Sequence, residues 1–298
     1  MKRAGQLTAE IRKGDFLSLA RALTLVENEL EGGKEILISL PANSKTPIIG
    51  VTGPPGAGKS TLVNALITKL AEKGKRIAIL AVDPTSPFNL GSLLGDRIRM
   101  SAHFNNSNVF IRSVATRGSV GGLSAKIIEM TDVLKAGSFD HIIVETVGVG
   151  QSEIEIAGLA DLTMVVLVPE AGDEIQHIKS GLMEIGDAFV VNKADREGAS
   201  AFAGNLTKML HQRKVAIPVF KTVADKNEGI DDLLKWVESF VPAKNNLKPH
   251  LYAEKAFRLI QNFRMKDMRK EELQLLISRE MASADFNLYK FVQGLEKK

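Results

Sequence analysis

The chain has 298 residues, of which 44% are hydrophobic and 25% are charged, a balance that is ordinary for a globular protein with a sizeable core. It contains no cysteine, which excludes disulfides and thiolate metal sites and is compatible with a reducing compartment. No apolar run approaches the length of a membrane span, and residues 1–13 lack the apolar segment of a secretory signal, so we expect a cytoplasmic protein without a membrane partner.

The net charge of +4 is concentrated in the last part of the chain. Residues 242–298 hold 12 Lys and Arg against 7 Asp and Glu, whereas the rest holds 27 against 28. This basic segment has neither a dense Lys/Arg block nor an aromatic RNA-binding motif. We interpret it as the solvated faces of amphipathic helices and expect no nucleic-acid partner.

Residues 1–47 are predicted to form a helical extension. Asp15 is placed to cap a helix, and Gly32-Gly33 is expected to end that helix. A helical repeat of apolar residues lies between them: Leu19, Leu23, Val26 and Leu30.

Residues 48–241 alternate apolar runs with helical segments, which predicts an α/β domain. The fold class that we expect is a three-layer sandwich with a mostly parallel central sheet and right-handed crossovers, plus helical extensions at both ends. Ligands of such sheets bind at the carboxyl ends of the strands. The predicted strands are 48–51, 76–82, 109–114, 141–145, 162–168, 188–191 and 217–220.

Residues 242–298 are predicted to form helices with apolar stripes. Such helices must pack either against the sheet domain or against a second copy of the chain. The stripes are formed by Leu273, Leu276, Ile277 and Met281, and by Leu288, Phe291, Val292 and Leu295.

A glycine-rich phosphate-binding loop lies between the first strand and the helix that begins near Leu62. Its glycines let successive backbone N–H groups point at phosphate, and the helix start adds a positive dipole end. Lys59 can reach the β- and γ-phosphates, and the Ser60 hydroxyl can ligate Mg²⁺. The domain is therefore predicted to be a P-loop NTPase. The residues expected to bind the nucleotide here are Gly53, Pro55, Gly56, Ala57, Gly58, Lys59, Ser60 and Thr61.

The segment Asn192-Lys193-Ala194-Asp195 follows the sixth predicted strand and fits the N-K-x-D pattern of guanine recognition. The Asp195 carboxylate can accept from the N1–H and the 2-amino group of guanine. Adenine has neither donor there and would leave the carboxylate buried and unpaired. Lys193 is expected to lie over the base, and Asn192 to brace the loop. GTP or GDP is the predicted nucleotide.

Acidic residues follow the strands on the side where Mg²⁺ is expected. Glu145 ends the strand 141–145 and can hold Mg²⁺ directly or through water, with Asp83 as a second acid. Asp96 is a third candidate, and an exposed loop acid is an equally good interpretation of it. The Gly148 N–H is placed to sense the γ-phosphate.

The usual residue that orients the attacking water is missing. Val149 follows Gly148 where small Ras-like GTPases carry a Gln, and Gln151 is the candidate further along the chain. We therefore expect slow intrinsic turnover that depends on a partner or on ordering of the switch segments. The five histidines are scattered, with no ligand-like pairing.

Five sequence blocks resemble the MeaB/ArgK family of P-loop GTPases, the methylmalonyl-CoA-mutase-associated proteins. These blocks are residues 53–61, 82–87, 115–124, 145–153 and 171–176. The resemblance implies a GTP-hydrolysing chaperone that gates cofactor loading into an adenosylcobalamin-dependent acyl-CoA mutase and protects or reactivates it. It also implies a homodimer formed through the C-terminal helices.

The resemblance further implies roles for individual residues. Residues 173–179 are similar to the loop that couples nucleotide state to the mutase. Val223 lies where the family has a hydroxyl residue in the loop that touches guanine O6, and the Ala224 N–H is the remaining candidate donor. The Mg²⁺ shell would be formed by Ser60, Asp83, Asp96 and Glu145.

Three alternatives remain open at this point. A regulatory GTPase with another protein client has the same motifs, because these do not identify the partner. A small-molecule kinase needs an acceptor pocket with a base, and no such constellation is readable. A metal-delivery GTPase is disfavoured by the missing Cys and His ligands.

Overall fold

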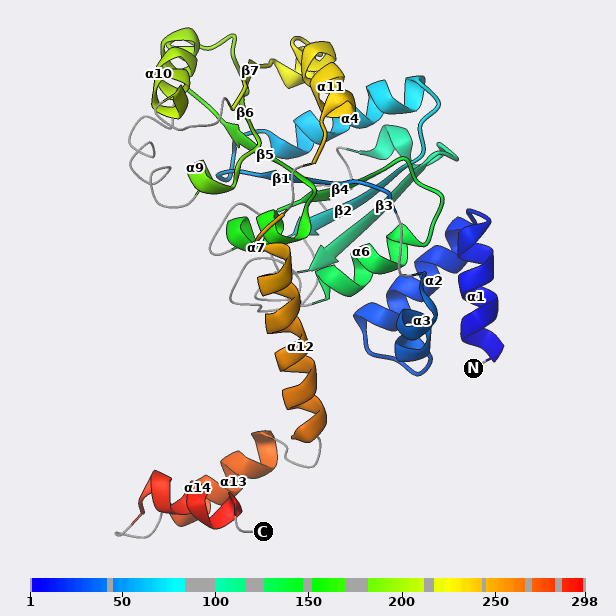
Figure 1. Ribbon diagram of the computed structural model, residues 1–298, viewed down its shortest axis with the longest axis vertical. Coiled ribbons are helices and arrows are strands. Elements are labelled where there is room, and N and C mark those ends of the chain that lie inside the picture. Colours follow the sequence, from blue (N-terminus) through cyan, green and yellow to red (C-terminus); the bar gives the residue numbers. More distant parts are fainter. Residues whose placement is uncertain are drawn as a thin grey trace. The chain divides into compact units, whose positions relative to one another are not determined.

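A computed structural model of the chain describes residues 2–41, 45–83, 100–115, 126–146, 152–169, 182–211, 217–242, 245–265, 270–281 and 286–296 (Figure 1). It divides into two compact units, Met1–Lys248 and Pro249–Lys298. The predicted boundaries at 47/48 and 241/242 stay predictions.

The first unit is built around a seven-stranded sheet whose neighbouring strands all pair in parallel. The strand order is β3-β2-β4-β1-β5-β6-β7, so β1 is the central strand. The glycine-rich loop therefore follows the carboxyl end of the middle strand of the sheet. The predicted fold class is confirmed. The strands are β1 (Ile48–Thr52), β2 (Ile77–Asp83), β3 (Val109–Ala115), β4 (His141–Glu145), β5 (Leu162–Leu167), β6 (Ala188–Val191) and β7 (Val219–Lys221).

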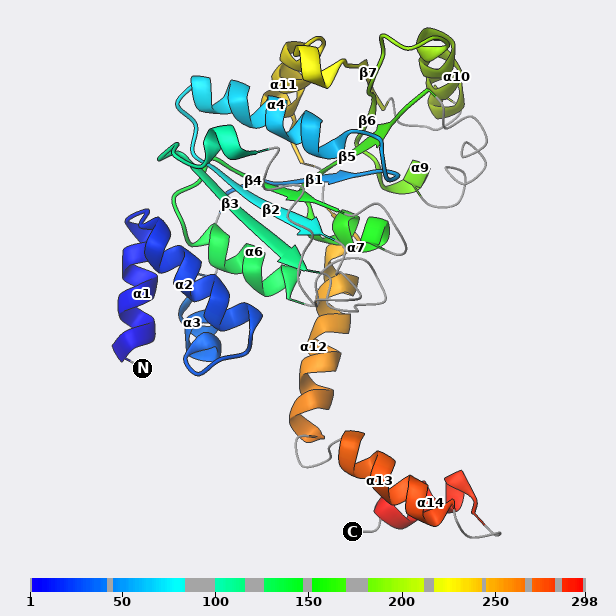
Figure 2. The ribbon, with the colours of Figure 1, turned by 180° about the vertical axis from the view of Figure 1, so that it is seen from behind.

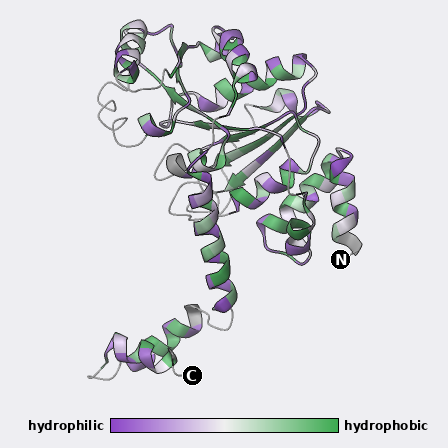
Figure 3. Ribbon diagram, viewed as in Figure 1, coloured by the Kyte–Doolittle hydropathy of each residue, from purple (hydrophilic) through white to green (hydrophobic). Residues whose placement is uncertain are grey.

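The central strands are mostly apolar, as expected for strands that helices cover on both faces of the sheet (Figure 3). Helices α4 and α11 lie over one face, and α6 and α7 lie over the other (Figures 1 and 2). The helices of this unit are α1 (Lys2–Arg12), α2 (Phe16–Glu27), α3 (Gly33–Ser39), α4 (Lys59–Glu72), α6 (Ile127–Lys135), α7 (Ser152–Leu159), α9 (Leu182–Ile185), α10 (Ala199–His211) and α11 (Ile230–Ser239). Short 3₁₀ turns form η1 (Ser101–His103) and η2 (Ala224–Lys226).

The N-terminal helices follow the prediction at their start and depart from it at their end. Asp15 caps α2, and its carboxylate accepts from the Ser18 N–H over 2.8 Å. The prediction that Gly32-Gly33 ends this helix is wrong, because α2 ends at Glu27 and Gly33 begins α3. The Asn28 side chain donates to Thr24 O and so satisfies a carbonyl at the true end of the helix.

An arginine anchors the N-terminal helices to the sheet. The Arg76 guanidinium donates to Gly14 O over 3.1 Å and lies over the rings of Phe16 and Phe139, 5.5 and 5.6 Å from their centroids. Arg112 of β3 pairs with Glu27 at the end of α2. These helices therefore belong to the same compact unit as the sheet.

The second unit consists of α12 (Lys248–Arg264), which begins one residue before it, α13 (Lys270–Glu280) and α14 (Leu288–Glu296). Large apolar side chains are exposed here, among them Phe257 at 65% and Phe263 at 66%. Among the described residues, we find no helix with both the length and the apolar character that crossing a membrane requires.

Candidate functional site

The loop after β1 depends on glycine for its shape. Gly53 has a φ of +139°, and a Cβ at this position would lie 2.0 Å from Val166 O of the neighbouring strand. Gly58 has a φ of +82° and is the N-cap of α4, and a Cβ there would lie 2.4 Å from the Asn192 amide nitrogen. A side chain at either position would displace a neighbour, so both contacts require glycine. Ala57 between them is fully buried, whereas Pro55 and Gly56 are exposed.

Lys59, the first residue of α4, turns its side chain back over this loop. Its ammonium donates to Gly53 O over 2.9 Å and to Pro54 O over 3.0 Å, and the residue is 7% exposed. The cation is therefore held at the mouth of the loop, where the helix start also favours negative charge. This is the place at which the sequence predicts the phosphate-binding lysine.

Ser60 and Glu145 meet inside the protein. Ser60 Oγ donates to Glu145 Oε1 over 2.6 Å, and the two residues are 6% and 3% exposed. Glu145 is brought there by β4, which pairs with β1 so that Glu145 lies opposite Val51. A hydroxyl and a carboxylate at this distance supply adjacent hard oxygen ligands, which is the donor chemistry that Mg²⁺ prefers. The residues present therefore fit the predicted Mg²⁺.

Other predicted members of the site lie wholly or partly outside the described residues. The backbone of Asp83 ends β2 at the same sheet edge, two residues beyond Ala81, which pairs with Glu145. Its side chain is not part of the description. Asp96, Gly148, Gln151 and the segment 173–179 all lie outside the described residues. Their roles stay predictions.

A pair of threonines that the sequence does not reveal lies beneath the site. Thr146 Oγ1 donates to Thr52 Oγ1 over 2.9 Å, and both residues are buried. The Thr146 N–H also donates to Val51 O over 3.0 Å. These bonds hold the carboxyl end of β4 against β1, and with it the carboxylate of Glu145.

Asn192 joins the two loops that are predicted to hold the nucleotide. Its amide nitrogen donates to Ala57 O over 3.0 Å in the glycine-rich loop. Its Oδ1 accepts from Thr222 Oγ1 over 3.1 Å and from the Ala224 N–H over 3.2 Å. The residue is 2% exposed, so these bonds form in a low-dielectric interior where leaving them unmade is costly. These bonds join the two loops, and the role of Asn192 in nucleotide binding stays a prediction.

Lys193 and Asp195 lie on the exposed side of this brace. The Lys193 ammonium donates to Gly56 O over 2.9 Å, and its backbone has a φ of +54°. Asp195 pairs with Lys226 over 2.8 Å. The hydrogen bond from Lys226 holds the pKa of Asp195 below its usual value, and the same bond raises the pKa of Lys226. Asp195 is therefore presented as a carboxylate, the form that guanine recognition needs.

Val223 and Ala224 lie in a buried turn that is bonded to Asn192. Val223 is 4% exposed, and its N–H donates to Glu228 O over 3.1 Å. The Ala224 N–H points at Asn192 Oδ1, so a bond from it to guanine O6 would have to share or replace this one. The contact of these two residues with the base stays a prediction.

The histidines of the described part do not assemble into a metal site. Among the described residues, no group of three or more His, Asp or Glu side chains could hold a metal ion. His103 instead contacts Thr68 Oγ1 over 3.2 Å, and burial lowers its pKa.

With this geometry established, comparison with known proteins identifies the family. The family model described as "Methylmalonyl Co-A mutase-associated GTPase MeaB" matches residues 19–280. A protein of Pyrococcus abyssi that carries the provisional name of a GTPase is 47% identical over 254 residues, which are 82% of this chain and 78% of the relative. The mouse protein named "Methylmalonic aciduria type A homolog, mitochondrial" is 35% identical over 251 residues, 76% of this chain and 60% of the relative.

A solved structure supports the same assignment. The crystal structure titled "LAO/AO transport system kinase" superposes with a TM-score of 0.65 at 27% identity, over 98% of this chain and 90% of that one. The predicted family resemblance is confirmed. The chain belongs to the MeaB family of methylmalonyl-CoA mutase-associated GTPases.

Proposed function

We propose that this protein is a GTP-hydrolysing chaperone of an adenosylcobalamin-dependent acyl-CoA mutase of the methylmalonyl-CoA mutase type. It would gate cofactor loading and protect or reactivate the mutase. The proposal of guanine-nucleotide binding is supported chiefly by the hydrogen bonds of Asn192, which brace the glycine-rich loop against the Thr222–Ala224 turn. That brace bonds the phosphate-binding loop to Asn192, three residues before Asp195 in the chain.

The reaction that we propose is attack of water on the γ-phosphorus of GTP, which breaks the bond to the oxygen bridging to the β-phosphate and releases GDP and inorganic phosphate. Lys59 would exchange its bonds to Gly53 O and Pro54 O for the β- and γ-phosphate oxygens. Ser60 and Glu145 would hold the Mg²⁺, with Asp83 and Asp96 completing its shell. The ion, when bound, offsets the negative charge of the phosphates. Gly148 and Gln151 are the proposed contacts to the γ-phosphate and the water, and without a Gln at Val149 we expect the isolated protein to turn over slowly.

The mutase client is proposed from names alone. The description of the family model and the name of the mouse relative both refer to methylmalonyl metabolism. The segment 173–179 is the proposed coupling loop. We propose the cytoplasm as the compartment, in keeping with the absence of cysteine.

A homodimer through the C-terminal helices is also part of the proposal. Three side chains of α12 that follow one another at helical spacing are more than half exposed: Phe257 at 65%, Ile260 at 53% and Phe263 at 66%. Burying such a stripe against a second copy would remove apolar surface from water. Sedimentation velocity of the wild type against a Phe257→Asp/Phe263→Asp variant tests this, and a monomeric wild type would contradict it.

A small-molecule kinase is the second candidate, because the structurally similar protein described above is titled a transport system kinase. A regulatory GTPase with another protein client is the third. One experiment separates the three. GTP and ATP turnover by the purified protein is measured alone and with an adenosylcobalamin-dependent acyl-CoA mutase.

We expect slow GTP turnover that rises when the mutase is added and negligible ATP turnover. GTP hydrolysis that is indifferent to the mutase would indicate another client. Transfer of phosphate from ATP to a small acceptor would favour the kinase and contradict the role of Asp195.

A further inference from the structure

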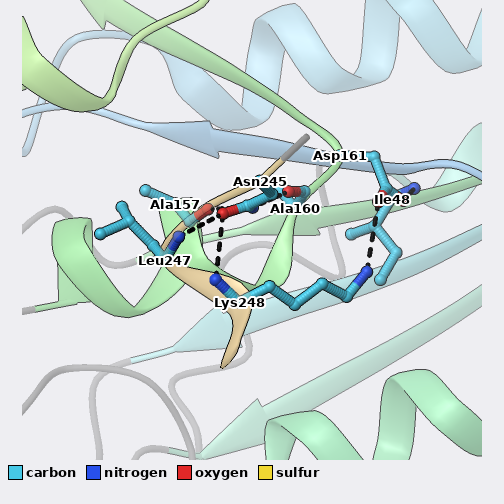
Figure 4. Close-up of polar contacts among 7 residues, drawn as sticks. All are labelled: Ile48, Ala157, Ala160, Asp161, Asn245, Leu247 and Lys248. Atoms are coloured by element: carbon cyan, nitrogen blue, oxygen red, sulfur yellow. Dashed lines mark hydrogen bonds and ion pairs between the residues drawn. The ribbon is translucent and has the colours of Figure 1, made fainter. Parts of the chain in front are cut away.

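Asn245 connects two helices that are far apart in the sequence. It lies in the segment between α11 and α12, and both ends of its side-chain amide are used (Figure 4). The neighbouring Asn246 is exposed. The chain therefore has two adjacent asparagines: the side chain of Asn245 bonds both helices, and Asn246 is exposed.

The amide nitrogen of Asn245 donates hydrogen bonds to carbonyls at the carboxyl end of α7. It donates to Ala157 O over 2.7 Å and to Ala160 O over 2.9 Å. Carbonyls at the end of a helix have no partner within the helix, so a side-chain donor here fixes the last turn in place.

The amide oxygen of the same side chain accepts hydrogen bonds at the start of α12. It accepts from the Leu247 N–H over 3.0 Å and from the Lys248 N–H over 3.1 Å, which is the bonding pattern of a helix N-cap. Lys248 adds an ion pair to Asp161 at 3.4 Å, and Asp161 in turn accepts from the Ile48 N–H over 2.9 Å at the start of β1. Lys248, the first residue of α12 and the last of the first unit, is thus paired with Asp161, which follows α7 and also bonds the start of β1.

Helix α7 is the next helix in the chain after β4, the strand that ends at Glu145. Glu145 ends β4, and α7 begins seven residues later at Ser152. The helix is seated on β1 at Gly50, where a Cβ would lie 2.7 Å from Ile156 Cγ1 and 3.0 Å from Ala160 Cβ. This contact is closely packed, so we expect a displacement of α7 to move the residues bonded to its carboxyl end as well.

We propose that Asn245 is a positioning residue that couples the nucleotide site to α12. It holds the end of α7 and the start of α12 in one hydrogen-bonded unit, so that a change of α7 between the GDP and GTP states alters the first turns of α12. The inference rests on guanine-nucleotide binding at the glycine-rich loop and does not depend on the mutase.

Two substitutions at Asn245 test the donor and the acceptor of the amide, and a third, at Asn246, is the control. Asn245→Asp keeps an oxygen acceptor for the α12 cap and removes the donor to α7. Asn245→Ala removes both halves. Asn246→Ala is the matched control, the same chemical change one residue along.

The experiment is hydrogen–deuterium exchange of the full chain with GDP–Mg²⁺ and with a non-hydrolysable GTP analogue and Mg²⁺, followed in peptides covering residues 250–258. Nucleotide affinity is measured first and is expected to stay within about twofold of wild type in all three variants, because Asn245 does not touch the glycine-rich loop.

We expect a nucleotide-dependent difference in the wild type and in Asn246→Ala. In Asn245→Asp this difference is lost while the exchange of α12 with GDP stays as in wild type. In Asn245→Ala it is lost and α12 also exchanges faster. A purely structural cap would change the basal exchange of α12 only.

The proposal is overturned if Asn245→Asp keeps the full difference, or if the wild type binds both nucleotides and shows none. A wild type that binds no guanine nucleotide would instead contradict the proposed function itself. The affinity measurement therefore distinguishes the two failures.

Discussion

Ser60 Oγ donates to Glu145 Oε1 over 2.6 Å, which joins the first turn of α4 to the end of β4 across 85 residues of sequence. The bond is buried, and Ser60 directly follows Lys59, which bonds the glycine-rich loop. The pair is the part of the predicted Mg²⁺ shell for which the structure gives contacts.

Replacing Glu145 with Gln keeps the acceptor for Ser60 but removes the charge that an ion would need. We expect the Mg²⁺ concentration for half-maximal GTP turnover to rise by about 10- to 100-fold. Turnover against Mg²⁺ concentration measures this. Glu129→Gln, which changes another buried Glu on α6, is the control and should leave the curve unchanged. A Glu145→Gln curve that coincides with wild type would remove Glu145 from the metal site.

Asn192→Ala should weaken both folding and nucleotide binding. The substitution leaves the buried Ala57 O and Ala224 N–H without their partner. We expect the free energy of unfolding to fall by about 2–4 kcal/mol, and GDP affinity to fall with it. Chemical denaturation and calorimetry test this. The exposed Asn205→Ala on α10 should be near neutral, and an equal effect of the two variants would refute the bracing role.

Gly53→Ala and Gly204→Ala should change stability in opposite directions. At Gly53 the new Cβ would meet Val166 O at 2.0 Å with a φ of +139°, so we expect a loss of at least about 3 kcal/mol. At Gly204, inside α10, nothing lies within 4 Å, so Ala should stabilise by about 0.5–1 kcal/mol. Thermal unfolding of both variants is the test, and a Gly53→Ala protein of wild-type stability would contradict the geometry of the loop.

The buried His103 should make the protein less stable in mild acid. Burial lowers its pKa in the folded state, so the unfolded chain takes up this proton first, near pH 6.5. The free energy of unfolding therefore falls as the pH drops from about 6.5 toward the folded pKa. Well above pH 6.5 this histidine has no effect on the free energy of unfolding. His103→Gln should flatten the curve between pH 7.5 and 5.5. Part of the slope should remain, because burial also lowers the pKa of His141. Parallel curves for wild type and variant would contradict the prediction.

The sequence predicts the sheet well because strands covered on both faces are continuous apolar runs. The run 141–145 is β4 with the same bounds, and 188–191 is β6. The end of α2 could not be predicted in the same way. Leu30 continues the helical apolar spacing but is 49% exposed, and the helix is ended by the Asn28 side chain rather than by glycine.

The site shows a similar division. Lys59 and Ser60 lie at the start of α4, Glu145 ends β4 and Asn192 directly follows β6, and their roles at a nucleotide stay predictions. Thr146, Lys226 and Asn245 were missed, since their roles come only from contacts made in the folded chain: with Thr52, with Asp195, and with the end of α7. No spacing in the sequence marks them.

The most direct test of a guanine-nucleotide site is calorimetric binding of GDP and ADP, each with Mg²⁺, to the wild type and to Asp195→Asn. The carboxylate of Asp195 can pair with two donors of guanine and with none of adenine, so we predict that GDP binds more tightly by about 10³-fold or more. Asp195→Asn should remove most of this preference, and Asp232→Asn on α11, also exposed and paired with a lysine, should keep it. Equal binding of ADP and GDP by the wild type would contradict the account.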